Sequence, residues 1–276
     1  MTGDNHVIAG AGIPGCHLFS GCGFPAPGLQ NFTFPPIFTI NLGGGVVFHF
    51  TKPMLIAFIC AAAVIVFFAF AFARPKLVPR GVQNIGELAL LFVRDQILRP
   101  SLGKKGDKYL SYLMSLFFFI WLMNLMEIIP VMEFPATSKI AFPTSLMLTV
   151  YLTYLYLGFK HQGFAGYFKN MIPRDVPLWV LGILIPIEVA RYFVVQPFTL
   201  AIRLFANMFA GHLLLAVFTV ATWYLAGLTI GALYAATSFA MVLGVTLLEA
   251  LIELLQAFIF TTLAAVYFAD SLEAGH

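Results

Sequence analysis

The chain has 276 residues, of which 61% are hydrophobic and only 10% are charged. A soluble domain carries roughly a quarter charged residues, so this composition excludes an ordinary soluble enzyme and indicates a protein embedded in a lipid bilayer. The formal net charge of +3 is too small, and the basic residues are too concentrated in short loops, to indicate a nucleic-acid partner.

Residues 1–45 are rich in Gly, Pro and aromatic side chains and lack the basic start and compact apolar core of a signal peptide. We expect an irregular cap outside the membrane. Cys16 and Cys22 flank a short Gly- and Pro-rich stretch, and they either form a disulfide in an oxidising compartment or stay reduced. A zinc pair is disfavoured because no second Cys pair accompanies them. The sequence predicts no metal and no cofactor.

Three apolar segments have the length of membrane spans, at about residues 54–73, 109–131 and 143–159. The hydrocarbon core of a bilayer is about 30 Å thick and needs about 20 apolar residues of helix to cross it. Each segment therefore predicts one transmembrane helix.

The segment at about residues 81–98 has a different pattern. Apolar residues recur at helical spacing opposite four polar ones (Val82, Ile85, Leu88, Ala89, Phe92 and Val93 against Gln83, Glu87, Arg94 and Asp95). Such a helix lies on the membrane surface. Docking on another subunit explains the pattern equally well, and the two interpretations are compatible.

Two long segments, Leu178 to Leu225 and Thr229 to Phe268, are apolar almost without interruption. At about 1.5 Å of rise per residue the first would be a helix about 70 Å long. That length is more than twice the hydrocarbon thickness, so the segment either folds into a hairpin or crosses at a steep tilt. Pro186 and Pro197 are natural bend points.

Lys and Arg are concentrated on one side of the predicted spans. Residues 74–108, after the first span, hold eight of the fifteen basic residues. The loop after the third span carries Lys160, Lys169 and Arg174, whereas the loop after the second carries only Lys139. Because short basic loops stay in the cytoplasm, we expect the N-terminus outside and the C-terminus inside.

The two long segments contain only six ionisable groups of the Asp, Glu, Lys, Arg or His type. A charge at the bilayer centre costs on the order of 3 kcal/mol by insertion scales, so such groups need a compensating role, commonly an ion path. The six are Glu188, Arg191, Arg203, His212, Glu249 and Glu253.

Arg203 is a permanent cation, because its guanidinium keeps its proton at any realistic pH. It is either one half of a buried structural ion pair or a fixed charge that faces a mobile carboxylate. Asn207 lies one helical turn later on the same face and either orients the guanidinium or hydrogen-bonds between helices.

Glu249, Glu253 and Gln256 fall at i, i+4 and i+7 and form one polar stripe. A hydrated half-path for ions and a polar subunit contact both explain this stripe, and two carboxyls in lipid favour the path. His212 is nine residues beyond Arg203, so it points to the opposite face and can meet the acidic stripe. A hydrogen-bonded core histidine is the alternative.

Three motifs resemble subunit a of F-type ATP synthases. Residues 197–212 (PFTLAIRLFANMFAGH) resemble the family's arginine-bearing helix, and residues 254–260 (LLQAFIF) resemble its last helix. Residues 122–130 (LMNLMEIIP) look like its second membrane helix. The motifs occur in the family's order, and the resemblance covers about residues 46–269.

The resemblance implies an all-α integral membrane protein with five transmembrane helices, one amphipathic surface helix, and a long, strongly tilted hairpin at about 176–269. Residues 46–276 then form a single proton-channel domain. Such a subunit carries protons through two offset half-channels beside a rotating ring of c-subunit proteolipids, which couples the proton-motive force to ATP synthesis. The implied partners are the c-ring, the peripheral-stalk b subunits and the rest of the complex, in a bacterial plasma membrane.

Carried over by motif, Arg203 resembles the arginine that faces the rotor carboxylate, with Asn207 and Gln256 as its polar neighbours. His212 and Glu249 occupy the positions where the family places a complementary titratable pair.

Three residues of the long segments fit the family pattern less closely. Glu253 is an additional acid on the proton path. Glu188 resembles the family's exit-channel glutamate, although it precedes Arg203 by fifteen residues, one more than in many relatives. Arg191 is a second arginine that snorkels toward the cytoplasmic surface.

The chain has no G-x-x-x-x-G-K-[ST] nucleotide loop, so the resemblance implies a non-catalytic subunit. A secondary transporter is the main alternative, but such proteins show internal repeats, and the two halves of this chain show none. An intramembrane hydrolase would need a nucleophile beside a base, for which Ser238 and His212 are the candidates.

Overall fold

The structure is a computed structural model that describes residues 24, 37–41, 47–74, 76, 78–129, 137, 139–170, 177–226 and 230–272. Cys16 and Cys22 lie outside the described residues. Within them the chain is almost entirely helical, which confirms the all-α fold class. The helices are α1 (Lys52–Phe72), α2 (Val82–Phe92), α3 (Arg99–Leu102), α4 (Leu110–Leu125), α5 (Ala141–Asn170), α6 (Leu178–Ala190), α7 (Gln196–Tyr224) and α8 (Ile230–Leu272), with π-helical turns at Val93–Leu98 and Arg191–Val195 and a 3₁₀ segment at Gly103–Tyr109.

Five helical stretches of the described chain are long and apolar enough to cross a membrane, as the sequence predicted. They are Lys52–Phe72, Gly106–Leu125, Ala141–Phe164, Val180–Tyr224 and Gly231–Leu272.

Two of the five differ from the predicted limits. The second ends at Leu125, earlier than the expected Val131, because the chain turns there and the backbone N–H of Glu127 bonds to the carbonyl of Asn124. The third continues past the expected Phe159, and Gly163 within it has a φ of 71°, in the left-handed region that glycine accepts most readily.

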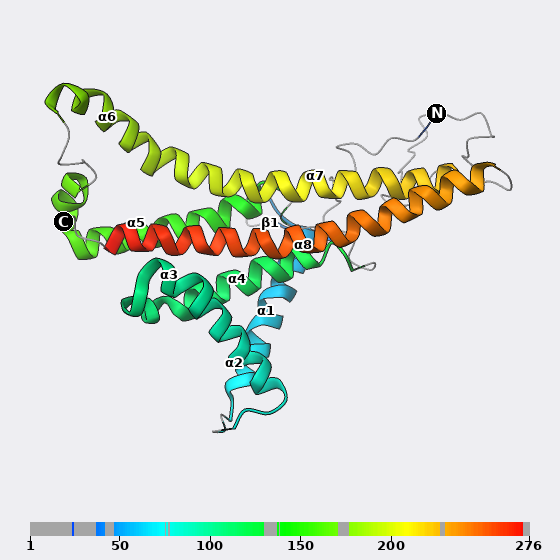
Figure 1. Ribbon diagram of the computed structural model, residues 1–276, viewed down its shortest axis with the longest axis horizontal. Helices are drawn as coiled ribbons and strands as arrows, with labels where there is room; N and C mark the ends of the chain where they lie inside the picture. Colours follow the sequence, from blue (N-terminus) through cyan, green and yellow to red (C-terminus); the bar gives the residue numbers. More distant parts are fainter. Residues whose placement is uncertain are drawn as a thin grey trace.

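The long segment before residue 225 does not fold back on itself. Helices α6 and α7, joined by the π-helical turn Arg191–Val195, form one continuous helical run, and its 45-residue apolar stretch is more than a membrane crossing needs. Figure 1 shows α7 and α8 lying side by side over most of their length, while α1 runs across their direction. This arrangement favours the tilted crossing over the hairpin within 178–225.

The core lies where α8 packs against α4, α5 and α7. Its side chains are large and apolar, so helix α8 is the centre of the fold and its polar positions are buried among other helices. Fully buried members include Leu113, Phe117, Ile120, Leu200, Leu204, Phe260 and Phe268.

Helix α2, the expected surface helix, packs on the end of α1 through its small and polar side. A Cβ atom placed on Gly86 would lie 2.7 Å from the Cβ of Ala71, so the two helices touch at this glycine. Gln83 is buried and donates hydrogen bonds to the backbone oxygen of Lys76 and to a carboxylate oxygen of Glu87. Most of the apolar side of α2 is exposed (Val82, Ile85, Leu88 and Leu91), whereas Phe92 at its end lies against Phe117 and Phe258.

A small antiparallel hairpin precedes α1. Strand β1 (Phe38–Asn41) pairs with β2 (Val47–Phe50), with Phe38 opposite Phe50. Both strands consist mostly of aromatic and β-branched residues, which favour this conformation. The C-terminal end of the segment expected to be irregular therefore contains one regular strand.

We predict that Gly86→Ala destabilises the protein, because the new methyl group would overlap Ala71. Overpacking of this kind costs about 1–3 kcal/mol, which exceeds the roughly 1 kcal/mol that alanine gains over glycine in a helix. Thermal unfolding of the purified protein in detergent measures the effect. Gly244→Ala on α8 is the control, since a Cβ there meets nothing within 4 Å. Equal melting temperatures for the two variants would contradict the packing described here.

Candidate functional site

The middle of the α7–α8 pair is held by a hydrogen bond between two amide side chains. Asn207 Nδ2 on α7 donates to Gln256 Oε1 on α8, at 2.8 Å. Both residues were predicted as site residues from separate motifs 49 positions apart. The bond fixes the register of the two antiparallel helices, and so it decides which other polar residues meet.

His212 lies beside a carboxylate, but its hydrogen-bonded partner is not the one expected. Its Nδ1 lies 3.1 Å from Oε1 of Glu127, which follows the C-terminal end of α4. Glu249 is close enough to act on the same charges, so His212 and Glu249 do come together with Glu127 between the helices. Glu127 was part of a recognised motif in the sequence and had no role assigned to it. The available signal was a lone acid at the end of an otherwise apolar predicted span.

Glu249 occupies the space beside a glycine on the neighbouring helix. A Cβ atom on Gly211 would overlap the carboxylate of Glu249. Only a residue without a side chain allows the carboxylate this position, one residue away from His212. Gly211 is therefore a structural part of the site that sequence spacing alone did not identify.

Glu253 lies one turn beyond Glu249 on α8 and has 0% of its surface exposed. Neither of its carboxylate oxygens has a hydrogen-bond partner among the described residues, and the same holds for both oxygens of Glu249, Oε2 of Glu127 and Nε2 of Gln256. Buried polar atoms without partners are costly, so a polar region of this kind is stable only when water or protons satisfy it.

Arg203 stands apart from this group. It lies one turn before Asn207, is half-buried, and makes no hydrogen bond or ion pair with any residue in the described part of the chain. The sequence left open a structural ion pair between Arg203 and an acid on a neighbouring segment. The described residues provide no such pair, and Glu249 and Glu253 of α8 lie toward His212.

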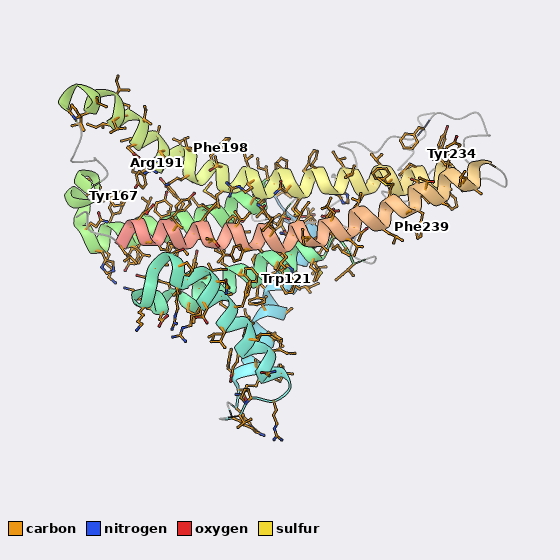
Figure 2. All side chains as sticks on the ribbon, in the orientation of Figure 1. Trp121, Tyr167, Arg191, Phe198, Tyr234 and Phe239 are labelled. Carbon is orange, nitrogen blue, oxygen red and sulfur yellow. The ribbon has the colours of Figure 1, made fainter. Side chains whose placement is uncertain are left out.

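In the described part of the chain, Glu188 has no hydrogen bond or ion pair with the other candidate site residues. It forms an ion pair with Arg191, at 2.7 Å from Nε to Oε2, and the Arg191 guanidinium lies 4.6 Å from the ring centre of Tyr192. The hydroxyl of Tyr154 on α5 donates to the backbone oxygen of Tyr192, at 2.9 Å, in the π-helical turn. Figure 2 shows Arg191 toward the end of the hairpin where the chain finishes, with Tyr234 at the opposite end.

Ser238 and His212, the candidate nucleophile and base of a hydrolase, have other partners. Ser238 Oγ donates to the backbone oxygen of Phe218, at 3.0 Å. Phe218 is six residues beyond His212, or about 9 Å along the helix. This geometry gives no support to a hydrolase.

We predict that Gly211→Ala and Glu249→Ala are energetically coupled. The alanine at 211 would force the Glu249 carboxylate, the far end of a flexible side chain, to move, and in the Glu249→Ala background this conflict is absent. Residues in contact show coupling of about 0.5–3 kcal/mol in double-mutant cycles. Denaturation of the four proteins measures this energy. Strictly additive effects would contradict the contact.

Comparison with known proteins gives the same family as the motifs. The model of the ATP synthase A chain family matches residues 54–269. ATP synthase subunit a of Streptomyces lividans is 44% identical over 263 residues, which cover 95% of this chain and 92% of that protein. The subunits of Frankia alni and Rhodospirillum rubrum are 40% and 37% identical and are covered over 88% and 97% of their lengths, with 92% and 88% of this chain aligned. This multi-pass membrane protein therefore belongs to the ATP synthase subunit a family of F-type ATP synthases.

Proposed function

We propose that this chain carries protons through two offset half-channels at its interface with a rotating ring of c subunits, and thereby couples the proton-motive force to ATP synthesis. The observation that carries the proposal is the state of Arg203. It is a permanent cation within a membrane helix, and it has no counter-charge among the described residues.

A charge at that depth costs on the order of 3 kcal/mol or more unless it is compensated. Because the described residues give Arg203 no hydrogen bond or ion pair with an acid, we expect its counter-charge to come from another chain. A carboxylate on a rotor helix is the partner of this chemistry, and a moving ring would bring one after another to the same arginine.

The outer half-path is the polar group between α4, α7 and α8. Its members are Glu127, His212, Glu249 and Glu253, with Asn207 and Gln256 at its inner end. All four titratable side chains can hold and pass a proton. The presence of a histidine among carboxyls favours protons over sodium ions.

Arg203 acts on the rotor carboxylate through the positive charge of its guanidinium. A proton from the outer path neutralises that carboxylate and allows it to enter the lipid. When it returns to Arg203, the cation favours the ionised form and the proton leaves toward the cytoplasm. The same fixed charge opposes direct proton flow between the two half-paths, since a proton would have to approach a guanidinium.

The inner half-path leads past Glu188, which is paired with Arg191 at the end of α6 that joins α7. Each proton that crosses supplies about 2.3 kcal/mol per 100 mV of membrane potential, so several must pass for each ATP. ATP is made on other subunits of the complex.

The exposed apolar side of α2 and the outer face of α1 are surfaces for lipid and for the peripheral-stalk b subunits.

We predict that Arg203→Ala abolishes coupled proton pumping in a complex that still assembles, and that passive proton leak rises. The reason is that Arg191, the other arginine of the same helical run, is paired with Glu188 and would not replace Arg203 at the rotor carboxylate. ATP-driven pumping and passive flux in vesicles measure both effects. Arg99→Ala is the control, because Arg99 forms an exposed ion pair with Asp95, at 3.5 Å on the surface-helix segment. Normal coupled pumping with Arg203→Ala would contradict the mechanism.

The proposed orientation, with the N-terminus outside and the C-terminus in the cytoplasm of a bacterium, has its own test. In a variant without the three native cysteines, Thr39→Cys and Lys104→Cys should label from opposite sides, since both positions are exposed. A membrane-impermeant maleimide should reach position 104 only in inside-out vesicles and position 39 only in right-side-out vesicles. The reverse pattern would overturn the orientation.

A further inference from the structure

The π-helical turn Arg191–Val195, which joins α6 to α7, contains a backbone carbonyl that the helix itself does not satisfy. The N–H of Gln196 donates to the carbonyl of Arg191, five residues back, so it does not serve Tyr192. The next backbone nitrogen belongs to Pro197, which carries no hydrogen. The carbonyl of Tyr192 therefore has no donor at either the α-helical or the π-helical spacing.

Tyr154 of α5 supplies the missing donor. Its hydroxyl donates to the carbonyl oxygen of Tyr192 at 2.9 Å, and only 2% of the Tyr154 surface is exposed. Its ring packs against Tyr151 of the same helix and against Tyr267 of α8, with ring centres 5.2 Å and 5.8 Å away. Because the ring is packed by two neighbours, the hydroxyl has a fixed place. Tyr154 thus ties the turn to the part of the core where α5 and α8 meet.

The two helices on either side of the turn are held differently. Helix α7 is anchored in the core by the buried side chains of Leu200, Leu204 and Met208. In α6, by contrast, none of the residues described at 180–190 is buried, and Figure 1 shows this helix diverging from α8. The direction in which α6 presents its side chains therefore depends on the turn that joins it to α7.

That direction matters for two residues of the proposed inner half-path. Glu188 and its partner Arg191 lie on the α6 side of the turn, whereas Arg203 lies on the anchored side. Each residue of an α-helix turns the chain by about 100°, and a π turn holds one residue more than an α turn. If the turn closed as a regular α-helix, Glu188 would rotate by about 100° relative to Arg203.

We propose that Tyr154 is a positioning residue, which fixes the π-helical turn through the carbonyl of Tyr192 and thereby sets the direction of the Glu188–Arg191 pair relative to Arg203. The consequence for proton movement rests on the proposed function. Tyr154 itself carries no proton along the path, and it acts only through the backbone that it holds.

The first test is Tyr154→Phe in the whole complex in inverted vesicles, because this change removes the hydroxyl and keeps the packed ring. We expect ATP-driven pumping to fall about fivefold, which is the effect of one typical hydrogen bond on an equilibrium. Tyr151→Phe is the matched control, since no hydrogen bond joins the Tyr151 hydroxyl to another residue in the described part of the chain. Pumping within about twofold of wild type for Tyr154→Phe would overturn the inference.

The second test measures the direction of α6 by the distance between two spin labels in the purified complex. With the other cysteines removed, Ile187→Cys on α6 and Leu152→Cys on α5 provide the pair, and both positions are exposed. We expect Tyr154→Phe to shift or broaden this distance and to leave that between Leu152→Cys and Leu214→Cys on α7 unchanged. A general loss of stability would not affect one pair alone. An unchanged distance between positions 152 and 187 would overturn the inference.

Pro197→Ala tests the cause of the turn, because it restores a backbone N–H and allows a regular α-helix, in which Gln196 serves Tyr192. In this background Tyr154→Phe should change the distance between positions 152 and 187 no further, and a change as large as in the parent would contradict the inference. Arg203→Ala separates the two proposals. If it stops pumping while Tyr154→Phe alters neither pumping nor distance, only the role of Tyr154 is wrong. If it pumps normally, the proposed function fails, and the distances still judge Tyr154.

Discussion

The antiparallel contact between α7 and α8, with the Asn207–Gln256 hydrogen bond near its centre, is the interaction on which the arrangement of the site depends. A hydrogen bond between two amide side chains forms only where the two face each other, so it adds to the apolar packing that sets the register of the two helices. In that register Gly211 lies against Glu249, and Arg203 remains outside the acidic group.

The site combines a close-packed apolar core with buried polar groups, which have opposite requirements in a membrane interior. Apolar packing of α8 against α4, α5 and α7 supplies the stability, and it begins immediately beyond Gln256, with Ala257 and Phe260 fully buried. Polar groups with unsatisfied atoms occupy the adjoining turns, at Glu249 and Glu253. The close-packed apolar core holds the helices in place, so the polar region beside it keeps its shape. An additional cation inside the acidic group would keep its carboxyls ionised and so prevent them from carrying protons.

The sequence alone predicted most of the fold and part of the site. Hydrophobic length identified three spans and two longer apolar segments, and helical spacing placed Glu249, Glu253 and Gln256 on one stripe, because both are local properties of the chain. The partner of His212 was not predictable in this way, since Glu127 is 85 residues distant and only tertiary packing brings it near. The choice between a hairpin and one continuous helix also depended on packing, because a proline such as Pro186 is compatible with both.

The π-helical turn Arg191–Val195 changes how this segment is to be aligned with its relatives. A π turn closes its hydrogen bonds one residue later than an α turn, so it holds one residue more without lengthening the helix in proportion. The fifteen residues from Glu188 to Arg203 then subtend the rotation of fourteen in an uninterrupted α-helix, which leaves the two side chains on nearly the same side. An insertion that looks like a shift of register in the sequence is thus absorbed as a local bulge. A change of one residue in the length of the segment 191–195 would therefore leave the direction of Arg203 unchanged.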